Sequence, residues 1–391
     1  MNKVRLVVIG GGCAGLSLAR RLSQFSAAPH TIIIEPRQEY VEDRTWCFWN
    51  GQDCTFDHLI QKRWPTVSVS SGQHTAVVEL NERHYQMLRS LDFYQDSRAL
   101  IAASDRVNLK CDESVVSVAQ LPNGGWRTQT TRGSYESDFI IDTRPHRATD
   151  QNPPTMWQTF LGFEVECDLS VFEPTNADLM DFGAVEGTNI PFIYILPIDE
   201  HRALFELTIL SPLRQESSGM VAPLLEAIQD KIGSTHFKIV REEFGAIPMG
   251  LSQSSASADP TYCHVGMANG SARPSSGYAF CRIQRWAESC CESLMKGSGP
   301  LSPSEDTRLV QFMDRIFLQV LRRHPALAPD LFLRMFNRVP IARLLRFLCD
   351  NPSLIDALSM VRSLPKLVFI REYFNIAVEP LAHSRTMTCS R

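Results

Sequence analysis

The stretch VRLVVIGGGCAG, residues 4–15, decides the fold of this chain. Residues 4–9 form a mainly apolar run, which is typical of a strand buried on both faces of a parallel sheet. The run ends in glycines with the spacing GxGxxG, and a helix is predicted to follow at about residues 14–25. A second short strand is predicted at residues 31–34. Strand, glycine turn, helix and strand in this order, within about 35 residues, predict a βαβ unit that binds a dinucleotide.

Each glycine of this motif has a physical role. Gly10 allows the tight turn, Gly12 lets the backbone approach a pyrophosphate, and Gly15 lets the helix pack closely on the strand. Glu35 follows the second strand and is expected to bind the ribose hydroxyls, where an acid disfavours a 2′-phosphate. The predicted ligand is therefore FAD or NAD rather than NADP. The alternative is a glycine-rich turn in an unrelated α/β protein.

The composition excludes several classes of protein. Hydrophobic residues make up 44% of the 391 residues and charged residues 21%, as in globular rather than fibrous or disordered chains. With 39 Lys and Arg against 43 Asp and Glu, the chain lacks the positive field that nucleic-acid binding usually exploits. The 11 cysteines form no CxxC pair, so we expect a reducing cytoplasm and no metal site. No run reaches the roughly 18 apolar residues of a membrane-spanning helix.

The rest of the chain is expected to divide into a sheet and a helical region. Three β-rich runs, 157–167, 192–196 and 203–210, predict an antiparallel sheet. From residue 302 onward, after the start signal SPSE, apolar residues recur at helical spacing. The expected domains are a dinucleotide-binding domain at 1–150, to which 245–300 return, a β-sheet domain at 151–244 with 46–80 as a candidate addition, and a helical region at 301–391.

The run ALFELTIL at 203–210 carries an acid in apolar surroundings. Burying a carboxylate is costly, so Glu206 either pairs with a cation or keeps a proton at a raised pKa. A carboxyl group with a raised pKa suits a general acid, whereas a salt bridge to a core arginine is the structural alternative. Period-two alternation gives two faces, one with Leu204, Glu206, Thr208 and Leu210 and the other with Phe205, Leu207 and Ile209.

Aromatic residues gather in the segment DRTWCFW at 43–49, where three rings occur within four residues. Such rings usually form core, but beside an isolated acid they would also line a long apolar tunnel whose π faces stabilise a cation. Periodicity does not decide between the two. Further rings that fit either interpretation are Phe160, Phe163, Phe192 and Tyr194.

Residues 307–348 are locally basic, with eight arginines against two aspartates. The composition predicts either an amphipathic surface that lies on a membrane or a solvated helix face over a core. The apolar residues interleaved with the arginines are Leu331, Phe332, Phe336, Leu344, Leu345 and Phe347.

Several segments together resemble the bacterial lycopene β-cyclases. The order and spacing match from residue 1 to about 374, and LPKL at 364–367 is similar to the end of that family's sequences. The segments are the GxGxxG start, DRTWCFW at 43–49, DTRP at 142–145, the Glu206 strand, GAIPM at 245–249 and PSSGYAF at 274–280.

The resemblance implies an α/β flavoprotein with a Rossmann-like FAD-binding domain, as in p-hydroxybenzoate hydroxylase and geranylgeranyl reductase, and an antiparallel-sheet substrate domain. It implies a cyclisation without net redox change that needs reduced FAD, with NADPH or another reductant as electron source. An acid protonates the terminal alkene of lycopene, the neighbouring double bond attacks the cation, and loss of a proton leaves the β-ionone ring of γ-carotene or β-carotene. The family's catalytic glutamate matches Glu206.

The resemblance also implies partners and further contacts. The expected partners are an apolar polyene and the cytoplasmic side of a membrane, to which the protein would bind peripherally. Further cofactor contacts are expected in the glycine turn, in the matching motifs and in the Gly-, Ser- and Pro-rich run 245–277, at Cys13, Ala14, Arg44, Gly266, Ser276 and Gly277.

One departure from the family and two alternatives remain. The family often has a second acid after the catalytic glutamate, where this chain has Leu207, which puts the ring type and the substrate in question. The first alternative is a redox flavoprotein, either a prenyl-chain reductase or an aromatic hydroxylase. Hydroxylases of this fold usually carry a Gly-Asp pair where this chain has Gly266 and Met267, which disfavours them. The second alternative is a pigment- or flavin-binding protein without catalysis.

Overall fold

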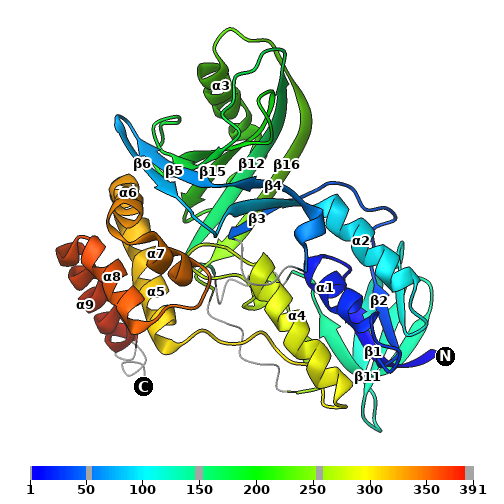
Figure 1. Ribbon diagram of the computed structural model, residues 1–391. Helices are drawn as coiled ribbons and strands as arrows, with labels where there is room; N and C mark the ends of the chain where they lie inside the picture. The colour runs from blue at the N-terminus through cyan, green and yellow to red at the C-terminus, as the bar shows by residue number, and fades with distance from the viewer. Residues whose placement is uncertain (1, 50–54, 146–152, 252–258, 384–391) are drawn as a thin grey trace.

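The computed structural model describes residues 2–49, 55–145, 153–251 and 259–383. In this part of the chain, two large β-sheets are joined by a small one and flanked by helices (Figure 1). The first sheet has the order β8-β2-β1-β11-β10-β9, with β17 beside β11. Its strands are β1 (Asn2–Ile9), β2 (Thr31–Ile34), β8 (Val107–Lys110), β9 (Val115–Gln120), β10 (Trp126–Thr130), β11 (Ser134–Asp142) and β17 (Tyr262–His264).

The central strand β1 explains why the N-terminal run is apolar. It pairs in parallel with β2 on one side and with β11 on the other, as the glycine motif predicts. Leu6 and Val8 face a core built with helices α1 and α4, whereas Val7 and Ile9 face a second core with Tyr135. Both faces of the strand are therefore covered, which a continuous apolar run requires. The helices of this domain are α1 (Cys13–Leu22), α2 (Ser90–Ala102) and α4 (Phe280–Met295).

The second sheet has the order β16-β12-β15-β14-β13-β5-β6 and is antiparallel except where β5 pairs with β13. Helix α3 (Val221–Ile232) covers one face, where Phe205 and Leu207 are buried, and Leu204 and Leu210 face the opposite core. The two predicted faces of the Glu206 strand are confirmed. The strands are β5 (Thr66–Ser71), β6 (His74–Glu79), β12 (Met156–Cys167), β13 (Asn176–Asp181), β14 (Ile190–Pro197), β15 (Arg202–Ser211) and β16 (Phe237–Met249).

Two segments cross between the domains. The hairpin β5–β6 leaves the first domain and adds two strands to the edge of the second sheet. The connecting sheet has the order β3-β7-β4, and its strands are β3 (Thr45–Trp49), β4 (Ile60–Trp64) and β7 (Tyr85–Arg89). Residues 245–249, expected in the first domain, continue β16 instead, because β16 pairs with β12 along its whole length. Within the described part of 245–300, β17 pairs with β11 of the first sheet and α4 packs into the core of the first domain.

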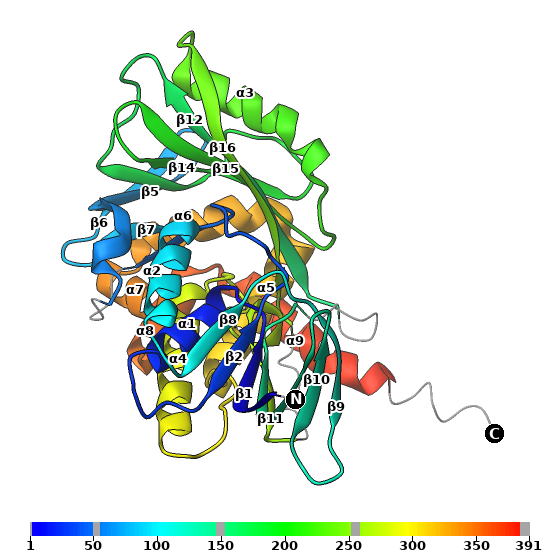
Figure 2. The ribbon, with the colours of Figure 1, turned by 90° about the vertical axis from the view of Figure 1, so that its right-hand side faces the viewer.

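The C-terminal helices pack on one another, and the second of them packs against β5 and β6 of the second sheet (Figure 2). They are α5 (Arg308–Arg323), α6 (Ala328–Arg338), α7 (Ile341–Leu348), α8 (Leu354–Ser363) and α9 (Lys366–His383). The first of them begins at Arg308 rather than at the SPSE signal, because the Thr307 hydroxyl caps it by accepting from the Val310 N–H. Among the described residues, no helix has the length and apolar character needed to cross a bilayer.

The apolar residues of the basic segment 307–348 are core. All six that were expected on an interfacial surface are buried in the cluster that joins α6 and α7 to the second sheet. The interfacial interpretation of these side chains is therefore wrong, because amphipathic helices turn their apolar stripe toward whichever surface is packed against them.

Candidate active site

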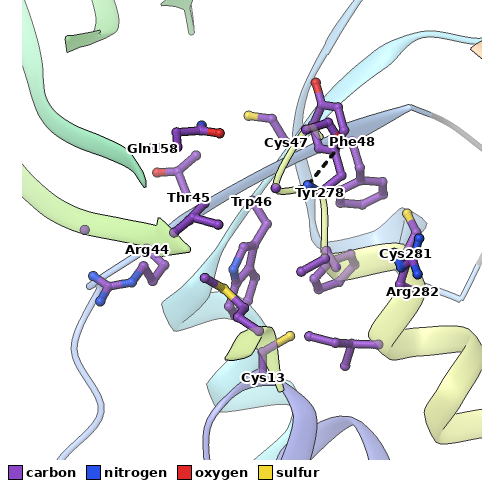
Figure 3. A pocket seen from close by; sticks show the side chains of 18 of the residues that line it. Cys13, Arg44, Thr45, Trp46, Cys47, Phe48, Gln158, Tyr278, Cys281 and Arg282 are labelled. Carbon is purple, nitrogen blue, oxygen red and sulfur yellow. Dashed lines mark hydrogen bonds between the residues drawn. The ribbon is translucent and has the colours of Figure 1, made fainter. Parts of the chain in front are cut away.

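A large cavity lies where the glycine turn, β3, the second sheet and the start of α4 meet (Figure 3). Its volume is about 1290 Å³. Ligand pockets are commonly about 300–1,000 Å³, so this cavity has room for a cofactor together with a second molecule. In Figure 3, Thr45 lies beside Gln158, Trp46 extends toward Cys13, and Cys47 and Phe48 lie near Tyr278. Residues of both sheets therefore share one cavity.

The glycine turn has the geometry that close approach of a phosphate requires. A Cβ atom on Gly10, whose φ is +100°, would lie 2.4 Å from Thr143 Oγ1, and one on Gly15 would lie 2.0 Å from the Gly10 carbonyl oxygen. Gly12 differs, because the atom nearest to such a Cβ is an Arg37 nitrogen 4.0 Å away. Two glycines are thus needed by the protein's own packing, and Gly12 leaves its backbone open at the N-terminus of α1.

Glu35 lies behind the glycine turn rather than in the cavity wall. Its buried carboxylate accepts the Gly11 N–H at 2.6 Å, and the Arg37 backbone N–H and Nε at 2.9 and 2.8 Å. In the structure, Glu35 therefore fixes the shape of the turn. Its expected contact with ribose hydroxyls stays a prediction.

The other residues expected to contact a cofactor mostly reach the cavity. Arg44 lies in the wall and donates to the Phe244 carbonyl at 3.2 Å, which ties the start of β3 to β16. Burial raises the pKa of the Cys13 thiol to about 12, which favours the protonated thiol at neutral pH. The expected residues that line the cavity are Gly12, Cys13, Ala14, Arg44, Gly266, Ser276 and Gly277. Those absent from its lining are Gly10, Gly15 and Glu35.

Glu206 projects from β15 into this cavity. The Thr208 hydroxyl donates to its carboxyl group at 3.1 Å. Burial, together with the nearby Glu243 carboxylate, raises the pKa of Glu206 to about 8. Among the described residues, no arginine forms an ion pair with Glu206. The side chain therefore holds a proton near neutral pH and presents it to the cavity.

The structural alternative for Glu206 is a salt bridge to a core arginine. The arginine nearby, Arg241, instead pairs with a second acid, Glu243 on β16. Arg241 donates to Glu243 Oε2 at 2.6 Å and to Glu164 Oε2 at 3.1 Å. The hydroxyl of Thr45 donates to the same Glu243 oxygen at 2.9 Å. The core arginine is thus engaged by acids other than Glu206. The segment REE at 241–243 carries a signal for this pair, because alternation places Arg241 and Glu243 on one face of a strand.

The aromatic residues divide between the cavity and the cores. Phe163 and Phe192 are buried in cores, so the tunnel interpretation does not hold for them. The expected aromatic residues that line the cavity are Trp46, Phe48, Trp49, Phe160 and Tyr194. Tyr85 and Tyr278, which sequence reasoning did not single out as lining residues, also contribute, and burial raises the pKa of both phenols well above the usual range. Their hydroxyl groups therefore stay neutral.

The sequence and the fold have known relatives. A family model described as "Lycopene cyclase protein" matches residues 5–372. A lycopene beta-cyclase from Pseudescherichia vulneris is 24% identical over 307 residues, which cover 76% of this chain and 75% of that protein.

Two solved structures show the same fold. A geranylgeranyl bacteriochlorophyll reductase-like protein from Thermoplasma acidophilum superposes with a TM-score of 0.60 at 13% identity, covering 95% of this chain and 98% of that one. The flavin-dependent monooxygenase PieE, solved in complex with FAD and substrate, has a TM-score of 0.58 at 15% identity, covering 93% of this chain and 71% of that one. The predicted α/β fold, a Rossmann-like domain with a second, antiparallel-sheet domain and a C-terminal helical region, is confirmed.

Proposed function

Because the chain belongs to the lycopene cyclase family, whose model matches residues 5–372, we propose that it is an FAD-dependent lycopene β-cyclase. The observation that carries this proposal is the position of Glu206, a carboxyl group with a raised pKa in the wall of a cavity rich in aromatic rings. Such a group delivers a proton to a hydrocarbon without a metal ion, and ring faces favour the cation that forms. Reaction at one or both ends of lycopene would give γ-carotene or β-carotene.

In the proposed reaction, Glu206 both donates the first proton and accepts the last one. Its O–H bond breaks as a C–H bond forms at the terminal alkene of the polyene, which leaves a tertiary cation. The neighbouring double bond supplies the electron pair of the new C–C bond, and the ring cation then loses a proton. The Glu206 carboxylate produced in the first step would accept that proton, so no net charge or electron is transferred.

The residues around the glycine turn fit an FAD molecule. Gly12 offers open backbone at the N-terminus of α1, and Arg44, Ser276 and Gly277 line the continuation of the cavity toward Glu206. Reduced FAD bound there would supply electron density near the developing cation. NADPH or another reductant would keep it reduced. Aromatic walls would exclude water, which would otherwise capture the cation.

We propose further that the protein works at the cytoplasmic surface of a membrane, because a polyene hydrocarbon dissolves in a bilayer and not in water. The chain must then collect its substrate from lipid.

Expression in a lycopene-accumulating bacterium tests the activity. We expect pigments with β-ionone rings, identified by chromatography and absorption spectra, and unchanged lycopene would contradict the proposal. With purified protein, catalytic amounts of NADPH should support many turnovers. Stoichiometric NADPH consumption with oxygen uptake would instead favour a hydroxylase, and stoichiometric NADPH consumption without oxygen uptake, with a saturated product, would favour a reductase.

A further inference from the structure

A second cavity lies among the C-terminal helices, and no step of the proposed reaction uses it. Its volume is about 460 Å³. Helices α5 to α9 all contribute to its wall, and 14 of the 19 lining residues are aliphatic, aromatic or methionine, the others being Arg273, Ser275, Ser276, Asp314 and Lys366. Representative lining residues are Ile316, Phe332, Phe347, Met360 and Phe369. A molecule bound in this cavity would make mainly apolar contacts with its walls.

The buried charges of this wall are neutralised within the protein. Arg273 and Asp314, whose side chains are 1% and 2% exposed, form a bidentate ion pair at 3.1 and 3.0 Å. Arg273 also donates to the Phe347 carbonyl and stacks on the Phe347 ring at 4.3 Å. A charged pair that is satisfied in this way does not call for a polar ligand. The cavity is therefore suited to a hydrocarbon.

The inner end of the second cavity adjoins the Glu206 cavity. Ser276 and Leu348 line both. Ser276 belongs to the same segment, 274–280, as the cofactor-contacting candidates, and Leu348 ends α7. The two cavities are therefore neighbours that share these two residues in their walls.

The outer end opens on an exposed apolar face. Four of its lining residues are themselves exposed: Phe312 at 44%, Val361 at 48%, Ile370 at 51% and Tyr373 at 44%. Figure 1 shows their helices, α5, α8 and α9, grouped on one side of the molecule. Large contiguous apolar patches are rare on soluble proteins unless they bind something. Further exposed apolar side chains on α8 and α9 are Leu354, Ile355, Leu358, Leu367 and Phe374.

The charge on this face is positive. Within residues 354–375 the basic side chains, Arg362, Lys366 and Arg371, are exposed. The two acids of the same segment are buried and paired, Asp356 with Arg346 and Glu372 with Arg323. Exposed apolar residues together with basic ones are the composition of helices that lie in the surface of an anionic bilayer.

We propose that the second cavity is a channel that takes an extended isoprenoid hydrocarbon from an anionic bilayer, through the face of α5, α8 and α9, to the Glu206 cavity. The identity of the hydrocarbon as lycopene rests on the proposed function. The channel also shelters the part of the chain that is not reacting. A long polyene needs such shelter, because each exposed methylene or methine unit opposes its departure from lipid.

Blocking the mouth of the channel tests this proposal. The variants Val361→Trp and Ile370→Trp place an indole at lining positions that are already half exposed, so the core is not disturbed. Matched controls are Leu358→Trp and Leu367→Trp, on the same helices at exposed positions outside the lining. The first readout is saturable fluorescence of diphenylhexatriene, an apolar polyene probe, with the full-length protein. We expect about tenfold weaker binding in the blocked variants and little change in the controls.

The second readout uses the substrate. In a Glu206→Gln background, which cannot protonate the polyene, lycopene retained per protein should fall with Val361→Trp and not with Leu358→Trp, while FAD content stays constant. Equal probe binding and equal lycopene loading in blocked and control variants would overturn the channel. The variants at the channel mouth could abolish probe binding while the wild type forms no β-rings in cells. In that case the proposed function is wrong, and the channel takes a hydrocarbon other than lycopene.

Vesicle flotation tests the bilayer contact. The triple variant Arg362→Glu, Lys366→Glu, Arg371→Glu should bind phosphatidylglycerol vesicles about tenfold less than the wild type, and phosphatidylcholine vesicles should bind both weakly. Unchanged flotation would remove this face as the docking surface. A charge-matched control on exposed positions of the first domain is Lys3→Glu, Lys110→Glu and Lys296→Glu.

Discussion

Glu206 and Glu243 lie on either side of Gly162, in three neighbouring strands with the order β15, β12, β16. A Cβ atom on Gly162 would lie 3.0 Å from Glu243 Cγ, so the glycine leaves the space in which the two acids approach each other. Two carboxyl groups that share a buried site favour a proton on one of them. Glu243 accepts hydrogen bonds from Arg241 and Thr45, whereas the pKa of Glu206 is raised, so the proton resides on Glu206.

Replacing the proposed acid should stop the chemistry and leave the cofactor site intact. Glu206→Gln keeps the shape of the side chain but has no acidic proton, and we expect a loss of at least about 100-fold in the rate of ring formation. FAD bound per protein should not change. Glu242→Gln, at the exposed position next to Glu243, is the control and should keep full activity. Ring formation by Glu206→Gln at the wild-type rate would remove Glu206 from the mechanism.

Glu243 should set the pH at which activity is lost. Activity requires the protonated form of Glu206 and should fall as the pH rises through its pKa of about 8. Glu243→Gln removes the negative charge that helps to raise this pKa, so the alkaline limb of the pH profile should move to lower pH. Arg241 keeps Glu164 as a partner in this variant. A profile with the same alkaline limb as the wild type would show that Glu243 does not act on Glu206.

The raised pKa of Glu206 also predicts how stability depends on pH. The folded protein keeps this proton up to about pH 8, whereas the unfolded chain releases it near the ordinary carboxyl value of 4.5. The contribution to the free energy of unfolding is therefore fully present below about pH 4.5 and is lost as the pH rises toward 8. Glu206→Gln lacks this loss. Calorimetry should show that the melting temperature of Glu206→Gln increases relative to that of the wild type as the pH rises from about 4.5 to about 8. A difference in melting temperature that does not change with pH would contradict the raised pKa.

Replacing Gly12 and replacing Gly15 should have different effects, the first on FAD binding and the second on folding. Gly12→Val points its side chain into open space next to the cavity, so the protein should fold but hold less FAD, by about tenfold or more. Gly15→Val places atoms against the Gly10 carbonyl oxygen and should prevent α1 from packing on β1. Flavin absorbance and circular dichroism separate the two outcomes. Normal flavin content in a folded Gly12→Val protein would show that the phosphates of FAD do not bind next to Gly12.

Local patterns predicted much of the fold and part of the site. The apolar run of β1, the glycines that follow it and the alternation in β15 each depend on residues a few positions apart, and their periods follow from backbone geometry. The same reasoning placed Glu206 among apolar neighbours and put its side chain on the other face of the sheet from that of Leu207. It could not decide whether the residues of segment 307–348 face a membrane or a core, because one amphipathic pattern serves both.

The amino-acid sequence by itself determined that a strand, a glycine turn, a helix and a second strand would form a βαβ unit, and that one strand would carry an acid on an apolar face. Only the tertiary structure decided that Glu243 rather than an arginine lies beside Glu206, that Glu35 holds the glycine turn, and that α5, α8 and α9 enclose a second cavity. The reason is physical. Periodicity fixes which way a side chain points within its own element, whereas the charges and surfaces it meets depend on the register between strands and helices that are far apart in the chain.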